Sequence, residues 1–99
     1  MMHVLVDSNF IIKDYFEPPV EFCFGEGGIT LRHLLVEIGR RCASVSFLEI
    51  LKEDELGESV DSLLFNEKNF FSLPEGLNTP LRDGDSLKLE IYIEPVDGG

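Results

Sequence analysis

The chain has few basic residues, and this shortage limits the partners that it can bind. Its 99 residues include 8 Lys and Arg against 19 Asp and Glu, a formal net charge of −11 at pH 7. Nucleic-acid backbones and anionic membranes are bound by clustered cations, so both are disfavoured as partners. The charge favours a protein partner with a basic surface, because opposite charges speed the encounter; solubility alone is the other interpretation.

Cysteine and long apolar runs are also scarce. Cys23 and Cys42 are the only cysteines, too few for a disulfide framework or a four-cysteine metal site. No apolar stretch approaches the roughly 18 residues that a membrane span requires, and the first residues lack the pattern of a signal peptide. We therefore expect a cytoplasmic protein with reduced thiols.

The rest of the composition is typical of one small globular domain. Hydrophobic residues make up 43 % of the chain and aromatic residues 10 %, mostly Phe, with no Trp. A chain of 99 residues is long enough for one modest core.

Alternation of apolar and polar residues predicts four or five strands. The clearest lies near the C-terminus, where Leu87, Leu89, Ile91 and Ile93 alternate with polar or charged side chains. A hairpin with its turn at residues 66–69 is expected as well, because Asn tolerates positive φ. The other expected strands are residues 4–12 (interrupted near 7–9), 20–24, 62–66 and 70–73.

One main helix is expected after Thr30, which is a good N-cap residue. Gly39 is a candidate for its C-cap. An apolar stripe at helical spacing would face the core, formed by Leu31, Leu34, Leu35 and Ile38.

Residues 44–56 are ambiguous. Ser46 and Glu49 have the spacing of a capping box, which favours a second short helix. Residues 44–47 could equally begin a strand. With either interpretation the element order predicts an α+β domain whose main helix covers one face of a mixed sheet, leaving the other face for water or a partner.

The chain ends in two glycines, Gly98 and Gly99. Because glycine has no Cβ, such a terminus suits a carboxylate that must enter a narrow active site of another protein. Pro95 lacks an amide donor, which should prevent strand pairing. We therefore expect a globular domain over residues 1–93 and a flexible tail over 94–99; a frayed terminus is the alternative.

Three segments together resemble a known family. Residues 28–39, 77–87 and 94–99 are similar to the first helix, the turn before the last strand and the tail of the ubiquitin-like β-grasp sulfur carriers, typified by ThiS and MoaD. The turn at residues 65–68 departs from the Val-Asn-Gly that these proteins often carry. The resemblance implies a β-grasp fold, with a mixed four- or five-stranded sheet packed on one main helix.

The resemblance also implies a function in which the chain is a substrate and carrier, not an enzyme, and binds no cofactor itself. A ubiquitin-activator-like adenylating enzyme would use ATP to convert the Gly99 carboxylate to an acyl-adenylate. A persulfide-bearing sulfur donor would then produce the thiocarboxylate used in cofactor or metabolite biosynthesis.

Two alternatives to the sulfur carrier remain open. The chain could be a protein modifier, attached to a lysine through Gly99, or a non-covalent β-grasp interaction subunit. Within the carrier interpretation, it could be a free carrier or the small subunit of a larger synthase, as the likeness to molybdopterin synthase would imply.

Partner contacts are expected at the open face of the sheet and at the base of the tail. Glu94 and Asp97 could meet basic residues of the activating enzyme. Burial in the core is the competing interpretation for Leu63 and Phe65. The predicted partner-binding residues are Phe65, Tyr92, Glu94, Val96 and Asp97.

Other groups that resemble reactive sites have simpler interpretations. Asp83 and Asp85 flank a glycine, where carboxylates usually cap backbone amides. His3 and His33 have no Cys or His neighbour in the sequence, so no metal site is expected. Cys42 is expected to be a small buried hydrophobic residue.

Overall fold

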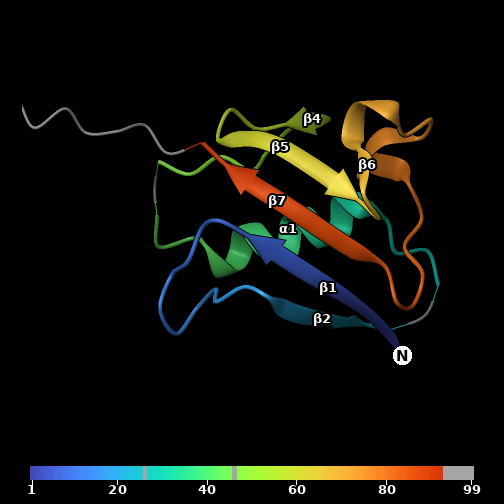
Figure 1. Ribbon diagram of the computed structural model, residues 1–99, viewed down its shortest axis with the longest axis horizontal. Helices are drawn as coiled ribbons and strands as arrows, with labels where there is room; N and C mark the ends of the chain where they lie inside the picture. Colours follow the sequence, from blue (N-terminus) through green and yellow to red (C-terminus); the bar gives the residue numbers. More distant parts are fainter. Residues whose placement is uncertain (26, 46, 93–99) are drawn as a thin grey trace, which may run out of the picture.

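The computed structural model describes residues 1–25, 27–45 and 47–92. It is an α+β fold in which a five-stranded mixed sheet, in the order β2-β1-β7-β5-β6, packs on the helix α1 (Figure 1). This is the ubiquitin-like β-grasp topology, so the predicted fold class is confirmed. The sheet strands are β1 (Met2–Ser8), β2 (Val20–Phe24), β5 (Val60–Phe65), β6 (Lys68–Asn69) and β7 (Ser86–Ile91).

The first and last strands pair at the centre of the sheet. β1 and β7 are parallel, in a register that places Leu5 opposite Ser86 and Ser8 opposite Leu89. β2 and β5 pair antiparallel on the two outer sides of this central pair. The N-terminal strand and the strand that leads to the C-terminus are therefore neighbours.

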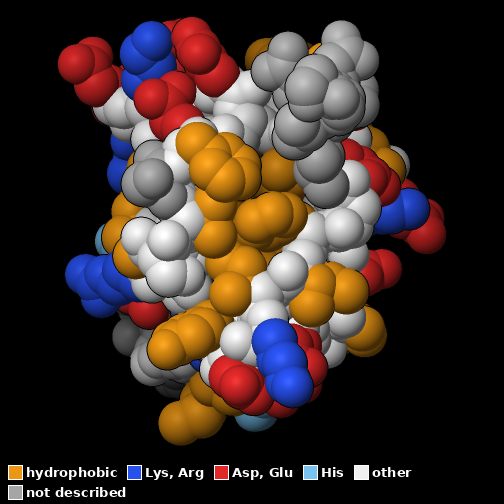
Figure 2. Space-filling view, turned by 90° about the vertical axis from the view of Figure 1, so that its left-hand side faces the viewer, with side chains coloured by type: hydrophobic (Ala, Val, Ile, Leu, Met, Phe, Trp, Pro, Cys, Tyr) orange, Lys and Arg blue, Asp and Glu red, His pale blue; other side chains and the backbone are white. Residues whose placement is uncertain are grey.

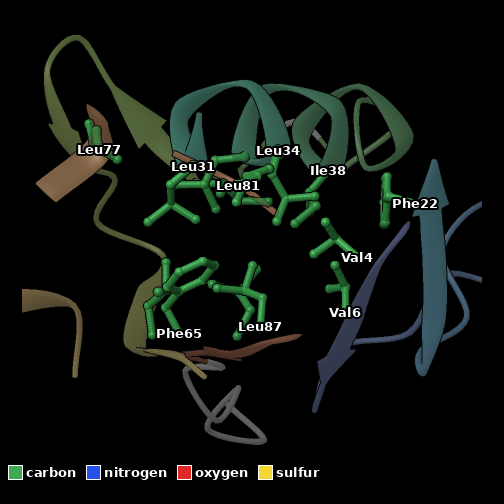
Figure 3. Close-up of a cluster of buried hydrophobic side chains, with 14 of the residues drawn as sticks. Val4, Val6, Phe22, Leu31, Leu34, Ile38, Phe65, Leu77, Leu81 and Leu87 are labelled. Atoms are coloured by element: carbon green, nitrogen blue, oxygen red, sulfur yellow. The ribbon is translucent and has the colours of Figure 1, made fainter. Parts of the chain in front are cut away.

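The helix α1 (Leu31–Arg41) supplies one side of the core (Figure 3). The apolar stripe predicted for it is completely buried, with 0 % exposure at all four positions, and it faces Val4, Val6 and Leu87 of the sheet. Thr30 is the N-cap, as predicted, and its backbone N–H donates to His33 Nδ1 at 3.0 Å. His33 thus does what Glu or Gln does in most capping boxes.

The predicted C-cap is wrong. Gly39 lies inside the helix, and Cys42 ends it, with its N–H donating to the carbonyls of Ile38 and Gly39 at 3.1 and 3.2 Å. Cys42 has a negative φ of −99°, so this helix end does not require a glycine. No helix in the described part of the chain is long and apolar enough to span a membrane.

The second helix predicted within residues 44–56 is also wrong for the residues that the structure describes. Residues 51–56 instead form a small hairpin, β3 (Leu51–Lys52) and β4 (Glu55–Leu56). Glu49 does not cap a helix, because its carboxylate accepts a hydrogen bond from the Glu58 N–H at 3.0 Å. Ser46 lies outside the described residues.

The hairpin around residues 66–69 is confirmed, and both Asn66 and Glu67 have positive φ, 50° and 70°. Its second strand is only two residues long. Residues 70–73, expected as a strand, begin a 3-10 helix, η1 (Phe70–Ser72), followed by a second, η2 (Gly76–Asn78). The first strand is shorter than expected, since β1 ends at Ser8.

Replacement of Leu34 should test the helix–sheet core. Leu34 is completely buried, so we expect Leu34→Ala to lower the free energy of unfolding by about 2–5 kcal/mol. Val36 lies on the same helix and is 39 % exposed, so Val36→Ala is the matched control, with an expected change within about 0.5 kcal/mol. Urea denaturation measures both, and equal effects would contradict this core.

Candidate functional site

The end of β7 is held by the segment that follows β1. Asn9 Nδ2 donates to the Ile91 carbonyl at 3.0 Å, and Asn9 Oδ1 accepts from the Ile91 N–H at 2.8 Å. Both hydrogen bonds are partly buried. A single amide side chain therefore satisfies both backbone groups of Ile91 and replaces a strand neighbour at this point.

On its other side, the end of β7 contacts a segment that lies after α1 in the sequence. The Tyr92 N–H donates to the Ser59 carbonyl at 2.8 Å, and the Ser59 N–H donates to the Glu49 carbonyl at 3.0 Å. The Glu49 N–H completes the connection by donating to Ser59 Oγ at 2.7 Å. Three segments that are distant in sequence thus meet where β7 ends.

These segments carry large exposed apolar side chains. Ile11 (64 % exposed) and Tyr15 (63 %) follow Asn9, Phe47 (79 %) precedes Glu49, and Tyr92 (58 %) follows β7; we call these four residues the exit surface. Figure 2 views this end of the molecule and shows hydrophobic side chains gathered across its middle, with most of the charged ones toward the margins. Large exposed apolar side chains that gather in this way are typical of an interaction site.

Most of the predicted site residues fall in the C-terminal segment that the structure does not describe. Gly98, Gly99, Glu94, Val96 and Asp97 lie outside the described residues.

Two further predicted partner-binding residues fall within the described range. Tyr92 is exposed and belongs to the exit surface. Phe65 is only 6 % exposed and packs in the core, as does Leu63 at 2 %. The prediction that Phe65 binds a partner is therefore wrong. The competing interpretation, burial in the core, is correct, because the side chain of Phe65 lies on the face of β5 that packs against α1.

The sheet face that points away from α1 has a mixed character. Leu5 is 47 % exposed there, and its neighbours include Asp7 and Lys88, around a shallow cavity of about 200 Å³. The exit surface has more large exposed apolar side chains, and residues 93–99 follow its member Tyr92 directly in the sequence. Sequence analysis identified Tyr92 but missed the other three members, because the hydrogen bonds that connect their segments to the end of β7 join residues distant in sequence.

The two aspartates near residue 84 act as predicted. Asp85 Oδ2 accepts from the Arg82 N–H at 2.7 Å, and Asp83 Oδ1 accepts from the His3 N–H at 2.8 Å. The hydrogen bond from the His3 backbone holds the pKa of Asp83 below its usual range. Both carboxylates thus organise the turn before β7.

The strand register gives His3 a neighbour that its place in the sequence does not show. The sequence offers His3 no Cys neighbour, yet β1 and β2 pair so that Cys23 lies directly opposite it. Glu21 lies on the same face, and one ligand atom from each of the three side chains falls within 4.8 Å of the others. The alternation of apolar and polar residues in β1 and β2 indicates which residues share the outer face of each strand. Only the strand register, however, places these three residues side by side.

The two cysteines differ in accessibility. Cys42 is 2 % exposed, and burial raises the pKa of its thiol, which keeps it in the unreactive protonated form. Cys23 is exposed on the outer face of β2. The interpretation of Cys42 as a small buried hydrophobic residue is confirmed.

Thiol labelling should separate the two. We expect a thiol-specific disulfide reagent to modify Cys23 alone in the native chain, and both cysteines in urea. The variant Cys23→Ser is the control and should show no rapidly reacting thiol without urea. Equal labelling rates for both thiols in the native chain would contradict the burial of Cys42.

Comparison with known proteins supports the fold and leaves the function open. No family model matches the chain, and no curated protein matches it significantly. The chain is similar to the solution structure of the HVO 2177 protein of Haloferax volcanii, with a TM-score of 0.68 and 18 % sequence identity. The match covers 99 % of this chain and 87 % of that chain. At this identity the likeness shows a shared fold alone.

Proposed function

We propose that the chain is a sulfur carrier whose Gly99 carboxylate is adenylated by a partner enzyme and converted to a thiocarboxylate. One observation supports this proposal above all. Hydrogen bonds with Asn9 on one side and Ser59 on the other fix the end of β7, where the exit surface lies. Gly99 follows Tyr92 by seven residues, so it stays within about 25 Å of this surface along an extended chain. A partner docked at the exit surface has the terminal carboxylate within its reach.

The chemistry requires an activating partner, because an ionised carboxylate is a poor electrophile. The Gly99 carboxylate attacks the α-phosphate of ATP, and pyrophosphate leaves as the acyl-adenylate forms. A donor persulfide then attacks the acyl carbon, and AMP leaves with the bonding electrons. A second thiol of the donor cleaves the resulting acyl disulfide, which leaves the thiocarboxylate on Gly99 and a disulfide on the donor.

We propose that the adenylating enzyme docks on the exit surface through an apolar patch surrounded by basic residues. The apolar part of such a patch would cover Tyr92 and Phe47, which are 58 % and 79 % exposed. The basic part is favoured by the net charge of −11, which steers a cationic partner toward the chain. Glu94, Val96 and Asp97 would extend this contact.

Intact-mass measurement after co-expression with the activating enzyme and sulfur donor from its own genome tests the chemistry. We expect a gain of about 16 mass units, the difference between sulfur and oxygen, at the C-terminus. Deletion of Gly99 should abolish the gain and leave the melting temperature unchanged, since the globular fold is built from residues 2–91.

The other outcomes of this experiment favour the alternatives. Lysine-linked adducts of high mass would favour a protein modifier. No change in mass under these conditions would contradict the carrier proposal and favour a non-covalent subunit.

A pair of matched variants tests the docking surface. We expect Tyr92→Ser to reduce kcat/KM of the adenylating enzyme for this chain by about 10-fold or more, because exposed aromatic residues are frequent anchors of binding energy. Phe71→Ser is the control, since Phe71 is 85 % exposed on η1, away from the end of β7. Equal effects of the two substitutions on pyrophosphate exchange would contradict docking at the exit surface.

A further inference from the structure

We propose that His3, Glu21 and Cys23 form a binding site for a zinc ion on the outer face of the sheet. The site lies on the strands β1 and β2 themselves, whereas Ile11 and Tyr15 of the exit surface lie in the connection between these strands. It is independent of the carrier function, and it uses the exposed cysteine that the proposed chemistry at Gly99 leaves unused.

The strand register brings the three side chains to one face. His3 pairs with Cys23, and Leu5 pairs with Glu21, in the antiparallel ladder of β1 and β2. Val4 and Phe22 alternate with these positions and face the core, at 0 % and 3 % exposure. Because successive side chains of a strand point to opposite faces, the three candidate ligands all point away from α1.

The spacing of the donor atoms suits a small tetrahedral site. One ligand atom from each residue lies within 4.8 Å of the other two, and Cys23 Sγ is 4.0 Å from Glu21 Oε1. Zinc bonds of about 2.0–2.3 Å require ligand atoms about 3.3–3.8 Å apart. The difference is about one ångström, which rotation of side chains at the surface can supply.

A carboxylate outside the triad orients the histidine. His3 Nδ1 lies 3.1 Å from Asp83 Oδ1, and the same oxygen accepts the His3 backbone N–H at 2.8 Å. With Nδ1 as the hydrogen-bond donor, the lone pair of Nε2 is left for a metal. A carboxylate that contacts the second nitrogen of a histidine in this way recurs at zinc sites.

The donor set determines the choice of metal. Imidazole nitrogen, thiolate sulfur and carboxylate oxygen together match zinc, whereas calcium and magnesium select oxygen ligands alone. Three protein ligands leave a fourth position for water or for a group from another molecule. The negative charge of the thiolate and of Glu21, together with the acidic chain, favours a cation here.

Cobalt and zinc titrations of the metal-free full chain test the site. We expect one Co²⁺ per chain, a thiolate-to-cobalt charge-transfer absorption and displacement by Zn²⁺. Cys23→Ser should remove this absorption and weaken zinc binding by about 10-fold or more. His3→Gln should weaken zinc binding by about 10-fold or more and keep the absorption at saturating Co²⁺, because Cys23 remains a ligand. Cys42→Ala is the matched control, since Cys42 is buried elsewhere in the core, and it should retain both signals.

If Asp83 positions the His3 ring for zinc, its replacement has a separate expected effect. Asp83→Asn should weaken zinc affinity by about 10-fold and keep the charge-transfer absorption, because Cys23 remains a ligand. Zinc should also raise the melting temperature of the wild-type chain by several degrees, and that of Cys23→Ser by much less, since a ligand bound to the native state stabilises it.

The proposal is overturned if the wild-type chain shows no charge-transfer absorption with Co²⁺. It is equally overturned if Cys23→Ser binds zinc as tightly as the wild type. Melting curves of the metal-free variants confirm that each one is folded. None of these measurements involves thiocarboxylate formation, so a failure of the zinc proposal would not contradict the carrier proposal, or the reverse.

Discussion

The parallel pairing of β1 with β7 is the constraint on which the rest of the structure depends. It brings the first and last strands together at the centre of the sheet, and the chain between them must return across one face. α1 lies in that return and covers the inner face. The turn before β7 is attached to β1 as well, because the Gly84 N–H donates to the His3 carbonyl at 2.8 Å and the Leu5 N–H donates to the Asp85 carbonyl at 3.0 Å.

This arrangement separates two kinds of surface. The apolar side chains of the exit surface lie on segments that hydrogen bonds connect at the end of β7. On the outer sheet face, the half-buried His3 of β1 comes close to the exposed Glu21 and Cys23 of β2. A small domain with one helix cannot cover both faces of its sheet, so one domain has room for both the proposed docking site and the proposed zinc site. A net charge of −11 favours cationic partners at both proposed sites.

The failures of sequence-based reasoning share one physical cause, which is competition between local and distant partners. The spacing of Ser46 and Glu49 matches a capping box, but the carboxylate of Glu49 bonds the Glu58 N–H and its amide bonds Ser59 Oγ. Gly57 is needed beside this segment, because a Cβ there would collide with the Glu49 backbone. Asn69 similarly ends the hairpin, because its side-chain oxygen accepts a hydrogen bond from the Phe71 N–H. The apolar residues that follow form the 3-10 helix η1 instead of extending the strand.

The sequence by itself determined the features that depend on neighbouring residues. These include the alternation of β2 and β7, the buried stripe of α1, the Thr30 cap and the turn at Asn66, because each follows from periodicity or from local backbone preference. Only the tertiary structure decided that Phe65 is core, that Asn9 holds Ile91 and that His3 faces Cys23. Such contacts join residues as many as 82 positions apart, and strand order and register, which no local pattern encodes, create them.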